Sequence, residues 1–556
     1  MKIIIIGSVA SGTSVAAKAR RNTEDAEITV YDQGKDISYS VCGIPYQIGG
    51  EVATIDELTP RNPSWFKKRY NVDIYTEHTV THVDAKEKTI TVENGFTGEV
   101  KKDTYDVLVL ATGASPIIPV PFDQKEYQNA FVVRNVQDDR DITAFISEKR
   151  PKKALIIGGG FIGLEMTEQL KHLGIAVTVV QRGQHIMPQM DSDMAFRVEE
   201  YLREKDIQLI LGDTVQSIVE TENAVTKVTT THGKEIETDM VILATGVRPN
   251  TALAKQSGVN IGETGAIEVN KHMQTNIPDV YAVGDVAESY SLLTNTPIYR
   301  PLGTTANKMG RIAGDVITGG NLAHRGILGT GIFRIFDLQV GYTGMTEKDA
   351  TKAGYDVEIL FNIKPDHAEY MGGKELTIKA LADKKTGRIL GAQAIGQGGV
   401  DKRIDVIATA ITFKAKAEDL FHLDLAYAPP FATTKDPVLY TGMALDNALK
   451  NNPLMTPEDL VNRQANDEAL QIVDTRSKKD FEKAHVKGAV HIPLAELRER
   501  SEELDKSLVT ITYCNKGVTG NAAQNVLIHH GFKKVYNLSG GNKNYQSYVR
   551  MMDSKK

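Results

Sequence analysis

The stretch KALIIGGGFIGLE, Lys153 to Glu165, reads as a short buried strand, a glycine turn and the start of a helix. Gly158, Gly160 and Gly163 have the G-x-G-x-x-G spacing, which permits a tight turn, close backbone approach to a pyrophosphate and close packing of the helix. The N-terminus of such a helix favours negative charge. A loop that merely turns is the alternative, but the flanking strand and the amphipathic helix argue for a dinucleotide-binding unit.

The same pattern is written a second time at the start of the chain. KIIIIGSVASG contains Gly7 and Gly12, with Val9 where the middle glycine would stand. Each glycine turn is followed at a distance by an apolar strand that ends in ATG, around Ala111 in YDVLVLATGASP and around Ala244 in TDMVILATGVRPN. This internal repeat predicts an α/β fold with two Rossmann-like nucleotide-binding units.

The residues that end the neighbouring strands suggest ligands. Asp32 ends EITVYD about 20 residues after the first turn, where an acid accepts hydrogen bonds from a ribose; the alternative is that it caps the loop. In the second unit the strand ends with Gln181 and Arg182, and an arginine there suits a 2'-phosphate, which favours NADPH and leaves NADH open. Asp285 in TNIPDVYAVGDVAE is either a helix cap or a ligand contact, and the context favours the ligand contact.

Bulk properties bound the class of protein. A chain of 556 residues predicts three or four domains. Its 41% hydrophobic and 24% charged residues are typical of a globular protein, and a net charge of -6 gives no electrostatic reason to expect nucleic acid or an anionic membrane surface as a partner. The start MKIIIIGSVASG lacks the pattern of a signal peptide, and no apolar run reaches the roughly 18 residues of a membrane span. With two cysteines, we expect a cytoplasmic protein.

Cys42 lies in SYSVCGIPY without an obvious partner, because the second cysteine is Cys514, near the other end of the chain. A lone buried thiol is the default interpretation of such a residue. Any chemical role must therefore come from its surroundings.

Three separated motifs, the N-terminal glycine turn, GGGFIG and YAVGDVAE, occur in the order found in the two-dinucleotide-fold flavoprotein disulfide reductases. The chain resembles that family from about Met1 to Asp446. The resemblance implies FAD in the first unit, NADPH or NADH in an inserted unit, and a homodimer. It suggests an FAD-binding domain at 1–120 and 244–324, a nicotinamide-binding domain at 121–243, a dimerisation domain at 325–446 and a linker at 447–455. The cofactor contacts predicted from the motifs and the resemblance are Gly7, Val9, Ala10, Gly12, Asp32, Ala111, Thr112, Gly113, Gly158, Gly160, Phe161, Ile162, Gly163, Gln181, Arg182, Gly246, Gly284 and Asp285.

Members of this family that use a disulfide carry C-x-x-x-x-C, but the matching run here is CGIPYQ, with Gln47 in the second place. The chain therefore resembles the single-cysteine branch, which contains coenzyme A disulfide reductases, NADH oxidases and NADH peroxidases. The resemblance implies a Cys42 thiolate against the flavin that cycles through a mixed disulfide, a persulfide or a sulfenate. A helix N-terminus commonly lowers a thiol pKa to about 3.5 to 7.5, so we expect a lowered pKa at Cys42.

The loop GSVASG has no histidine, whereas oxygen- and peroxide-reducing relatives typically carry one there, and it is similar to the G-x-V-A-x-G loop of coenzyme A disulfide reductases. HAEYMGG and AYAPPF resemble the tyrosine motifs of that subfamily, which implies that Tyr370 and Tyr427 donate protons or orient the substrate. Each tyrosine could instead be a packed aromatic. The resemblance also implies coenzyme A contacts, with cations for its phosphates, at Ser14, Lys18, Arg21, Ser38 and Lys435. We expect no metal ion.

The segment 456–556 resembles a rhodanese domain through VDTR, HVKGAVHIPL, the cysteine loop and NLSGG. Cys514 ends a strand and opens the loop CNKGVT, which we expect to be an exposed junction whose backbone N–H groups favour a thiolate or persulfide. Thr519 stands where rhodanese loops often have arginine, and Lys516 could supply that charge. A structural cysteine is the alternative.

The hypothesis is an FAD-dependent NAD(P)H reductase of coenzyme A persulfide and coenzyme A disulfide, in which Cys514 takes up or presents sulfane sulfur and Cys42 reduces it. The rivals are an NADH oxidase or peroxidase, and a sulfurtransferase or sulfur carrier on a flavoprotein scaffold. The sequence leaves open NADH against NADPH, persulfide against disulfide, the donor to Cys514, and whether sulfur passes within or between chains.

Overall fold

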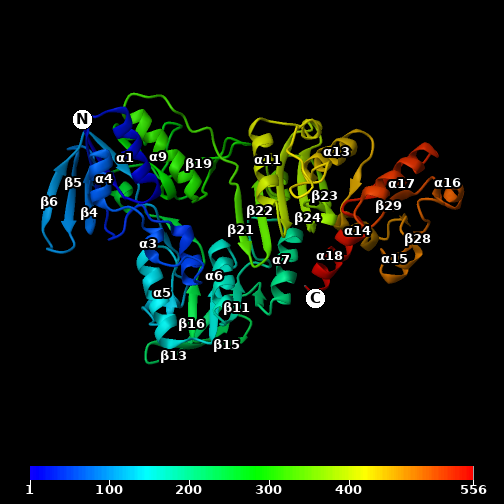
Figure 1. Ribbon diagram of the computed structural model, residues 1–556, viewed down its shortest axis with the longest axis horizontal. Helices are drawn as coiled ribbons and strands as arrows, with labels where there is room; N and C mark the ends of the chain where they lie inside the picture. Colours follow the sequence, from blue (N-terminus) through cyan, green and yellow to red (C-terminus); the bar gives the residue numbers. More distant parts are fainter. Residues whose placement is uncertain (555–556) are drawn as a thin grey trace. The chain divides into compact units, whose positions relative to one another are not determined.

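The computed structural model describes residues 1–554 and groups them into two compact units, shown along the chain in Figure 1. One unit holds Met1–Ile186 with Arg203–Gly329, and the other holds Met187–Leu202 with the chain from Thr330 onward. Helix α7 (Ser192–Glu204) therefore lies mostly in the second unit, although its sequence falls inside the predicted nicotinamide-binding segment. None of the helices in residues 1–554 is both long and apolar enough to cross a membrane.

The first unit contains two parallel five-stranded sheets in which four strands follow the same order and the fifth comes from a different place in the chain. The first sheet runs β18 (Val280–Ala282), β7 (Val107–Leu110), β1 (Lys2–Ile6), β2 (Glu27–Tyr31), β3 (Asp73–Tyr75). The second runs β9 (Ala130–Phe131), β16 (Met240–Leu243), β10 (Lys153–Ile157), β11 (Ala176–Gln181), β12 (Gln208–Leu211). The predicted internal repeat and the two Rossmann-like domains are confirmed.

The apolar runs of the sequence explain these sheets. Ile3 to Ile5 of β1 are completely buried, and they pair with β2 on one side and β7 on the other. Strands covered on both faces read as continuous apolar runs rather than alternating ones. Because parallel strands end at the same edge, Gly7, Asp32 and Ala111 meet there.

The two glycine turns have matching backbone geometry. Gly7 has a φ of +111° and Gly158 a φ of +113°, in the region that L side chains rarely adopt. A Cβ on Gly7 would run into the carbonyl oxygen of Ala111, and one on Gly158 would run into that of Ala244. The glycine turn of each Rossmann-like domain is therefore fixed by close contact with the strand that ends in ATG.

Helices and small antiparallel sheets complete the first unit. α1 (Ala10–Asn22) packs against α9 (Gly303–Ile317), where Gly310 and Gly314 leave room for the α1 backbone. The small sheets are β4 (His78–Asp84), β5 (Thr89–Asn94), β6 (Val100–Thr104) and β13 (Val215–Thr221), β14 (Ala224–Thr230), β15 (Glu235–Glu237). The other helices that matter for the site are α2 (Ile44–Ile48), α4 (Pro63–Tyr70), α5 (Val136–Lys149) and α6 (Phe161–His172).

The second unit contains an antiparallel and a parallel sheet. The antiparallel sheet runs β21 (Gly331–Ile335), β22 (Leu338–Gly344), β25 (Ile389–Gly396), β24 (Glu375–Asp383), β23 (Val357–Pro365). It packs against α11 (Val400–Thr412) and α13 (Pro437–Lys450), while α10 (Glu347–Lys352) and α12 (Ala417–Phe421) flank these elements. The parallel sheet runs β26 (Leu454–Met455), β30 (Val535–Leu538), β29 (Val509–Tyr513), β27 (Leu470–Asp474), β28 (Ala489–His491), with α14 (Pro457–Ala465), α15 (Lys478–Lys483), α16 (Leu497–Arg500), α17 (Val518–His529) and α18 (Gly541–Asp553).

The two sheets of the second unit are joined by direct hydrogen bonds. The Phe361 N–H on β23 donates to Ser539 Oγ at 2.8 Å, and Ser539 Oγ donates to the Ile359 carbonyl at 3.2 Å. The Leu454 N–H donates to Glu358 Oε1 at 3.1 Å. The C-terminal α/β domain is therefore docked on the edge strand β23.

A buried lysine holds α7 in the second unit. Lys379 on β24 is 1% exposed, and its Nζ lies 2.8 Å from Asp193, 3.0 Å from Asp191 and 3.0 Å from Glu347. Gln393 also donates to Asp191 at 2.6 Å. Three carboxylates therefore share one buried cation, and of the three Asp191 is the most deeply buried.

We expect Lys379→Met to lower the free energy of unfolding of the second unit by about 3 to 5 kcal/mol, because it leaves buried carboxylates without their cation. Lys384→Met is the matched control, since Lys384 pairs with Asp356 on the surface at 2.9 Å and should contribute less than about 1 kcal/mol. Urea unfolding followed by circular dichroism measures both. Equal unfolding midpoints for the two variants would contradict this assignment.

Candidate functional site

Cys42 lies in a short 3-10 turn, Val41–Gly43, directly before α2. Both cysteines are free thiols, and Cys42 is exposed on the polypeptide. A buried structural thiol is therefore the wrong interpretation of Cys42. The helix that follows the turn contacts α6 of the nicotinamide-binding Rossmann-like domain, because Tyr46 on α2 donates its hydroxyl to Glu165 Oε1 on α6 at 3.1 Å.

The chain itself raises the pKa of the Cys42 thiol. Partial burial of the thiol is the largest cause, the negative charge of Glu165 adds to it, the positive charge of Arg134 opposes it, and Asp285 raises the pKa again. The predicted lowering is wrong because partial burial of the thiol and two nearby carboxylates raise its pKa, and α2 has only five residues to oppose them. Arg134 is thus the group of the chain that favours the thiolate.

Arg134 and Asp285 form an ion pair that sequence reasoning missed. Arg134 Nη2 lies 2.8 Å from Asp285 Oδ2, and both side chains are mostly covered. Asp285 sits in a 3-10 turn after β18, and Tyr299 donates its hydroxyl to the Asp285 carbonyl at 2.8 Å. The carboxylate pairs with an arginine instead of capping a helix, so the cap alternative is wrong.

In both Rossmann-like domains a side chain at a neighbouring strand end accepts hydrogen bonds from the glycine loop. The Ser8 N–H and hydroxyl donate to Asp32 Oδ2 at 2.7 and 2.6 Å, and the Gly34 N–H donates to Oδ1 at 2.7 Å. In the second Rossmann-like domain the Gly159 N–H donates to Gln181 Oε1 at 2.9 Å. Asp32 therefore does cap the loop, and a contact of Asp32 with a ribose stays a prediction.

The space around the loops fits a dinucleotide. A Cβ on Gly160 would meet no atom within 4 Å, so the second loop is open on the side that faces away from the strands. Thr112 and Asn250 exchange hydrogen bonds at the ATG turn, and Arg182 is exposed beyond β11. The other predicted cofactor residues lie in the same turns or in the first helical turn after them: Val9, Ala10, Gly12, Gly113, Phe161, Ile162, Gly163, Gly246 and Gly284.

A cavity of about 470 Å³ opens beside α1. Three of the predicted coenzyme A residues line it, namely Ser14, Arg21 and Ser38. Lys18 does not line it and is paired with Asp315 at 2.9 Å. Among the lining residues that the sequence did not predict are Arg61, Trp65, Asn307 and Arg311. The basic-aromatic run RNPSWFKKRY was a signal for Arg61 and Trp65, whereas Asn307 and Arg311 had none.

Two of these residues shape the cavity wall. Arg61 Nη1 donates to Ser38 Oγ at 3.2 Å, and its guanidinium lies 5.3 Å from the centre of the Trp65 ring. This combination of cations, hydroxyls and an aromatic face suits a ligand that carries phosphates and a planar base.

Tyr370 and Tyr427 lie in the second unit on adjoining segments, since the Ala368 N–H donates to the Pro429 carbonyl at 3.2 Å. Tyr370 is 79% exposed and Tyr427 is 49% exposed, so neither is a packed core aromatic. The buried Arg403 holds both segments: its Nη2 donates to the Asp366 carbonyl at 2.6 Å and lies 2.7 Å from Asp436.

Cys514 ends β29 and opens the loop before α17. Its Sγ accepts the Gly517 N–H at 3.1 Å, as expected for a loop that favours a thiolate. The predicted exposure is wrong, because Cys514 is 6% exposed. The start of α18 covers it, with the Asn542 N–H donating to the Cys514 carbonyl at 2.8 Å.

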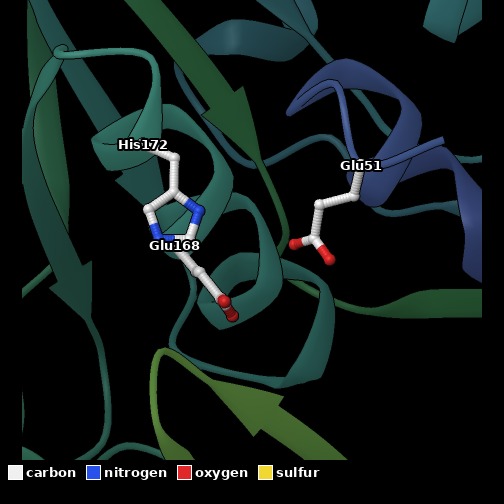
Figure 2. Close-up of side chains that lie close together, drawn as sticks. All are labelled: Glu51, Glu168 and His172. Atoms are coloured by element: carbon white, nitrogen blue, oxygen red, sulfur yellow. The ribbon is translucent and has the colours of Figure 1, made fainter. Parts of the chain in front are cut away.

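One group of side chains in residues 1–554 has the composition and spacing to hold a metal ion: Glu51, Glu168 and His172, whose ligand atoms lie within 4.8 Å of one another. Figure 2 shows Glu168 and His172 side by side on one helix, α6, with Glu51 facing them from a separate segment. Glu51 and His172 are exposed, and Gln169 donates to Glu51 Oε1 at 3.0 Å. An imidazole near two carboxylates is also an ordinary electrostatic contact, so we assign no metal role.

We expect Glu165→Gln to shift the pH midpoint of Cys42 alkylation downward, because it removes a negative charge that raises the pKa of the thiol. The glutamine can still accept the Tyr46 hydroxyl. Iodoacetamide alkylation followed by peptide mass spectrometry measures the midpoint. Glu148→Gln, at an exposed position of α5, is the control, and an unchanged or raised midpoint in Glu165→Gln would refute the electrostatic account.

Known proteins match the whole of this arrangement. Residues 1–299 match the pyridine nucleotide-disulphide oxidoreductase family. Residues 332–437 match the dimerisation domain of that family, and residues 456–548 match the rhodanese-like domain. An NADH oxidase of Methanocaldococcus jannaschii is 39% identical over 81% of this chain and 99% of its own length. An NAD(P)H coenzyme A polysulfide/persulfide reductase of Pyrococcus horikoshii is 38% identical over 80% of this chain and 98% of its own.

Two solved structures match almost the full chain. The structure of reduced Bacillus anthracis CoADR-RHD is 38% identical, with a TM-score of 0.95, over 99% of this chain and 98% of its own. The NAD-dependent persulfide reductase of A. fulgidus is 36% identical, with a TM-score of 0.89, over 98% of this chain and 100% of its own. The chain belongs to the pyridine nucleotide-disulphide oxidoreductase family and carries a rhodanese-like domain after its dimerisation domain.

Proposed function

We propose that this protein is an FAD-dependent NAD(P)H reductase of coenzyme A persulfide and coenzyme A disulfide, acting as a homodimer in the reducing cytoplasm. The observation that carries the proposal is an unpaired, exposed Cys42 at the junction of two dinucleotide units, on a chain whose second sulfur sits in a rhodanese loop. The full-length likeness to CoADR-RHD and to a persulfide reductase supports it. The domain limits predicted from the sequence are part of this proposal, with FAD in the first Rossmann-like domain and the nicotinamide cofactor in the second.

The chemistry is a two-electron reduction at sulfur. The Cys42 thiolate attacks the coenzyme A sulfur of the substrate, which breaks the S–S bond and releases hydrosulfide from the persulfide or coenzyme A thiolate from the disulfide. Bound FAD supplies the hydride equivalent of NAD(P)H that reduces the Cys42–coenzyme A disulfide to two thiolates. The net reactions consume one NAD(P)H and one proton, and yield coenzyme A with H₂S, or two coenzyme A molecules.

Residues of the chain have separate tasks in this cycle. The Arg134 charge stabilises the Cys42 thiolate against Glu165 and Asp285. The α1 cavity receives the nucleotide end of coenzyme A through Ser14, Arg21 and Ser38. Tyr427 donates a proton or a hydrogen bond to the departing thiolate across the dimer interface, and Tyr370 lies on the adjoining segment. Both phenols are exposed, as this role requires.

An NADH oxidase is the second candidate, since the M. jannaschii relative bears that name. The glycine loop of this chain offers Ser8 and Val9 but no histidine beside the thiol. An oxygen-reducing enzyme that passes through a Cys42 sulfenate needs a proton donor there. The rhodanese-like domain also has no role in an oxidase.

Steady-state turnover with coenzyme A persulfide, coenzyme A disulfide, oxygen and peroxide, measured side by side, tests the proposal. We expect the two coenzyme A substrates to dominate. Cys42→Ser should abolish both activities, because Cys42 is the cysteine of the two dinucleotide-binding domains and Cys514 lies in the rhodanese-like domain. Cys514→Ser is the matched control, which should leave disulfide reduction unchanged and impair sulfur delivery.

Dominant oxygen turnover would contradict the proposal and favour the oxidase. Bound FAD that NAD(P)H does not bleach would point instead to a sulfur carrier on a flavoprotein scaffold.

A further inference from the structure

Arg403 is a buried cation on α11 of the second unit, with a side chain that is 1% exposed. Its Nε donates to Asp436 Oδ1 at 3.3 Å, and its Nη2 donates to Asp436 Oδ2 at 2.7 Å and to the Asp366 carbonyl at 2.6 Å. Its Nη1 donates to the Gly399 carbonyl at 3.1 Å, and a Cβ on Gly399 would collide with that nitrogen. The planar fork of an arginine can make all of these contacts at once.

The Asp366 carbonyl belongs to the base of the loop that carries Tyr370. The Asp366 N–H donates to the Lys374 carbonyl at 2.8 Å, and the Lys374 N–H donates to Asp366 Oδ1 at 2.7 Å, so the loop is closed at this base. Asp366 is 5% exposed, whereas Tyr370 is 79% exposed. Arg403 therefore holds the buried base of a loop whose tip presents a phenol to solvent.

Asp436 ends the segment that begins at Tyr427. The Asp436 carboxylate is buried, and its Oδ1 also accepts the Val438 N–H at 2.9 Å at the start of α13. The Ala368 N–H of the first loop donates to the Pro429 carbonyl of this segment at 3.2 Å. The two segments that carry the tyrosines are therefore joined to each other and to the same guanidinium.

Neither tyrosine lies on an element long enough to fix a side chain by itself. Residues 366–374 contain one 3-10 turn, and residues 423–428 contain no helix or strand. An exposed side chain on such a segment samples many positions unless tertiary contacts hold the backbone. A proton donor acts only within hydrogen-bond reach, and a displacement of about 1 Å can lower a rate about 100-fold.

We propose that Arg403 is a positioning residue for sulfur reduction, which holds Tyr427 and Tyr370 where they protonate the departing coenzyme A thiolate. The inference rests on the proposed function, because it assumes that the two tyrosines serve the reaction at Cys42. In this step the Cys42 thiolate bonds to one sulfur of coenzyme A disulfide, and the S–S bond of the substrate breaks. The other sulfur leaves with the electron pair of that bond and takes the phenol proton, which solvent later returns to the tyrosinate.

The inference is tested by kcat/KM for coenzyme A disulfide in the wild type, Arg403→Lys, Tyr370→Phe/Tyr427→Phe and the variant that combines these changes. Lysine keeps the charge but has no planar fork to span Asp436 and the Asp366 carbonyl. We expect Arg403→Lys to lower kcat/KM at least about tenfold when the phenols are present. Without the phenols the same change should lower it less than about twofold, because the displaced rings have no proton to donate.

Controls separate positioning from loss of the fold. Lys402→Met is the matched control, because Lys402 Nζ lies 3.8 Å from the same Asp436 carboxylate but is partly exposed, and it should leave kcat/KM unchanged. NAD(P)H should bleach bound FAD at the wild-type rate in Arg403→Lys, since that step uses the two Rossmann-like domains. If Arg403→Lys does not elute as the wild-type oligomer, Arg403→Gln/Asp436→Asn replaces it, because both buried charges are then removed together.

An equal loss of kcat/KM with and without the phenols would overturn the inference, because Arg403 would then act on the fold or on another group. A wild-type kcat/KM in Arg403→Lys would overturn it as well. A full kcat/KM in Tyr370→Phe/Tyr427→Phe would refute the role of the tyrosines and this inference together. Failure of the Arg403 variants alone leaves reduction at Cys42 intact, which Cys42→Ser tests separately.

Discussion

The close approach of a glycine turn to the end of a neighbouring strand is the constraint on which the first unit depends. Gly7 lies against the Ala111 carbonyl and Gly158 against the Ala244 carbonyl, both at a positive φ that excludes a side chain. This contact sets where each helix begins and leaves the helix N-terminus open to an anionic ligand. Cys42 comes after the first glycine turn in the chain, and Glu165 comes after the second. The charge of Glu165 acts on the thiol because the two Rossmann-like domains meet there through Tyr46.

The two sulfurs lie in contrasting electrostatic surroundings. Cys42 is exposed and faces two carboxylates, with Arg134 as the opposing charge, so the chain keeps its pKa high. Cys514 is covered, and its Sγ accepts a backbone N–H. At Cys42, Arg134 is the group of the chain that favours the thiolate.

Much of the fold could be predicted because its signals are local. Apolar runs that end in a glycine turn identify parallel strands, and the repeat of that pattern identifies two Rossmann-like domains. Cys42 could be singled out because CGIPYQ keeps the first cysteine of a C-x-x-x-x-C run and has Gln47 in place of the second. Arg134 could not, because FVVRNV contains an ordinary cation until the fold brings Asp285 to it from 151 positions away. The exposure of Cys514 was predicted wrongly because the sequence does not show that α18 covers the loop.

The most direct test of the central claim is to trap the sulfur intermediate. The oxidised holoenzyme is mixed with coenzyme A disulfide without NAD(P)H, quenched in acid, and digested for peptide mass mapping. The account predicts a coenzyme A adduct on the peptide that contains Cys42, which disappears when NAD(P)H is added before the quench. An adduct confined to Cys514, or a Cys42 peptide that never gains coenzyme A, would contradict it.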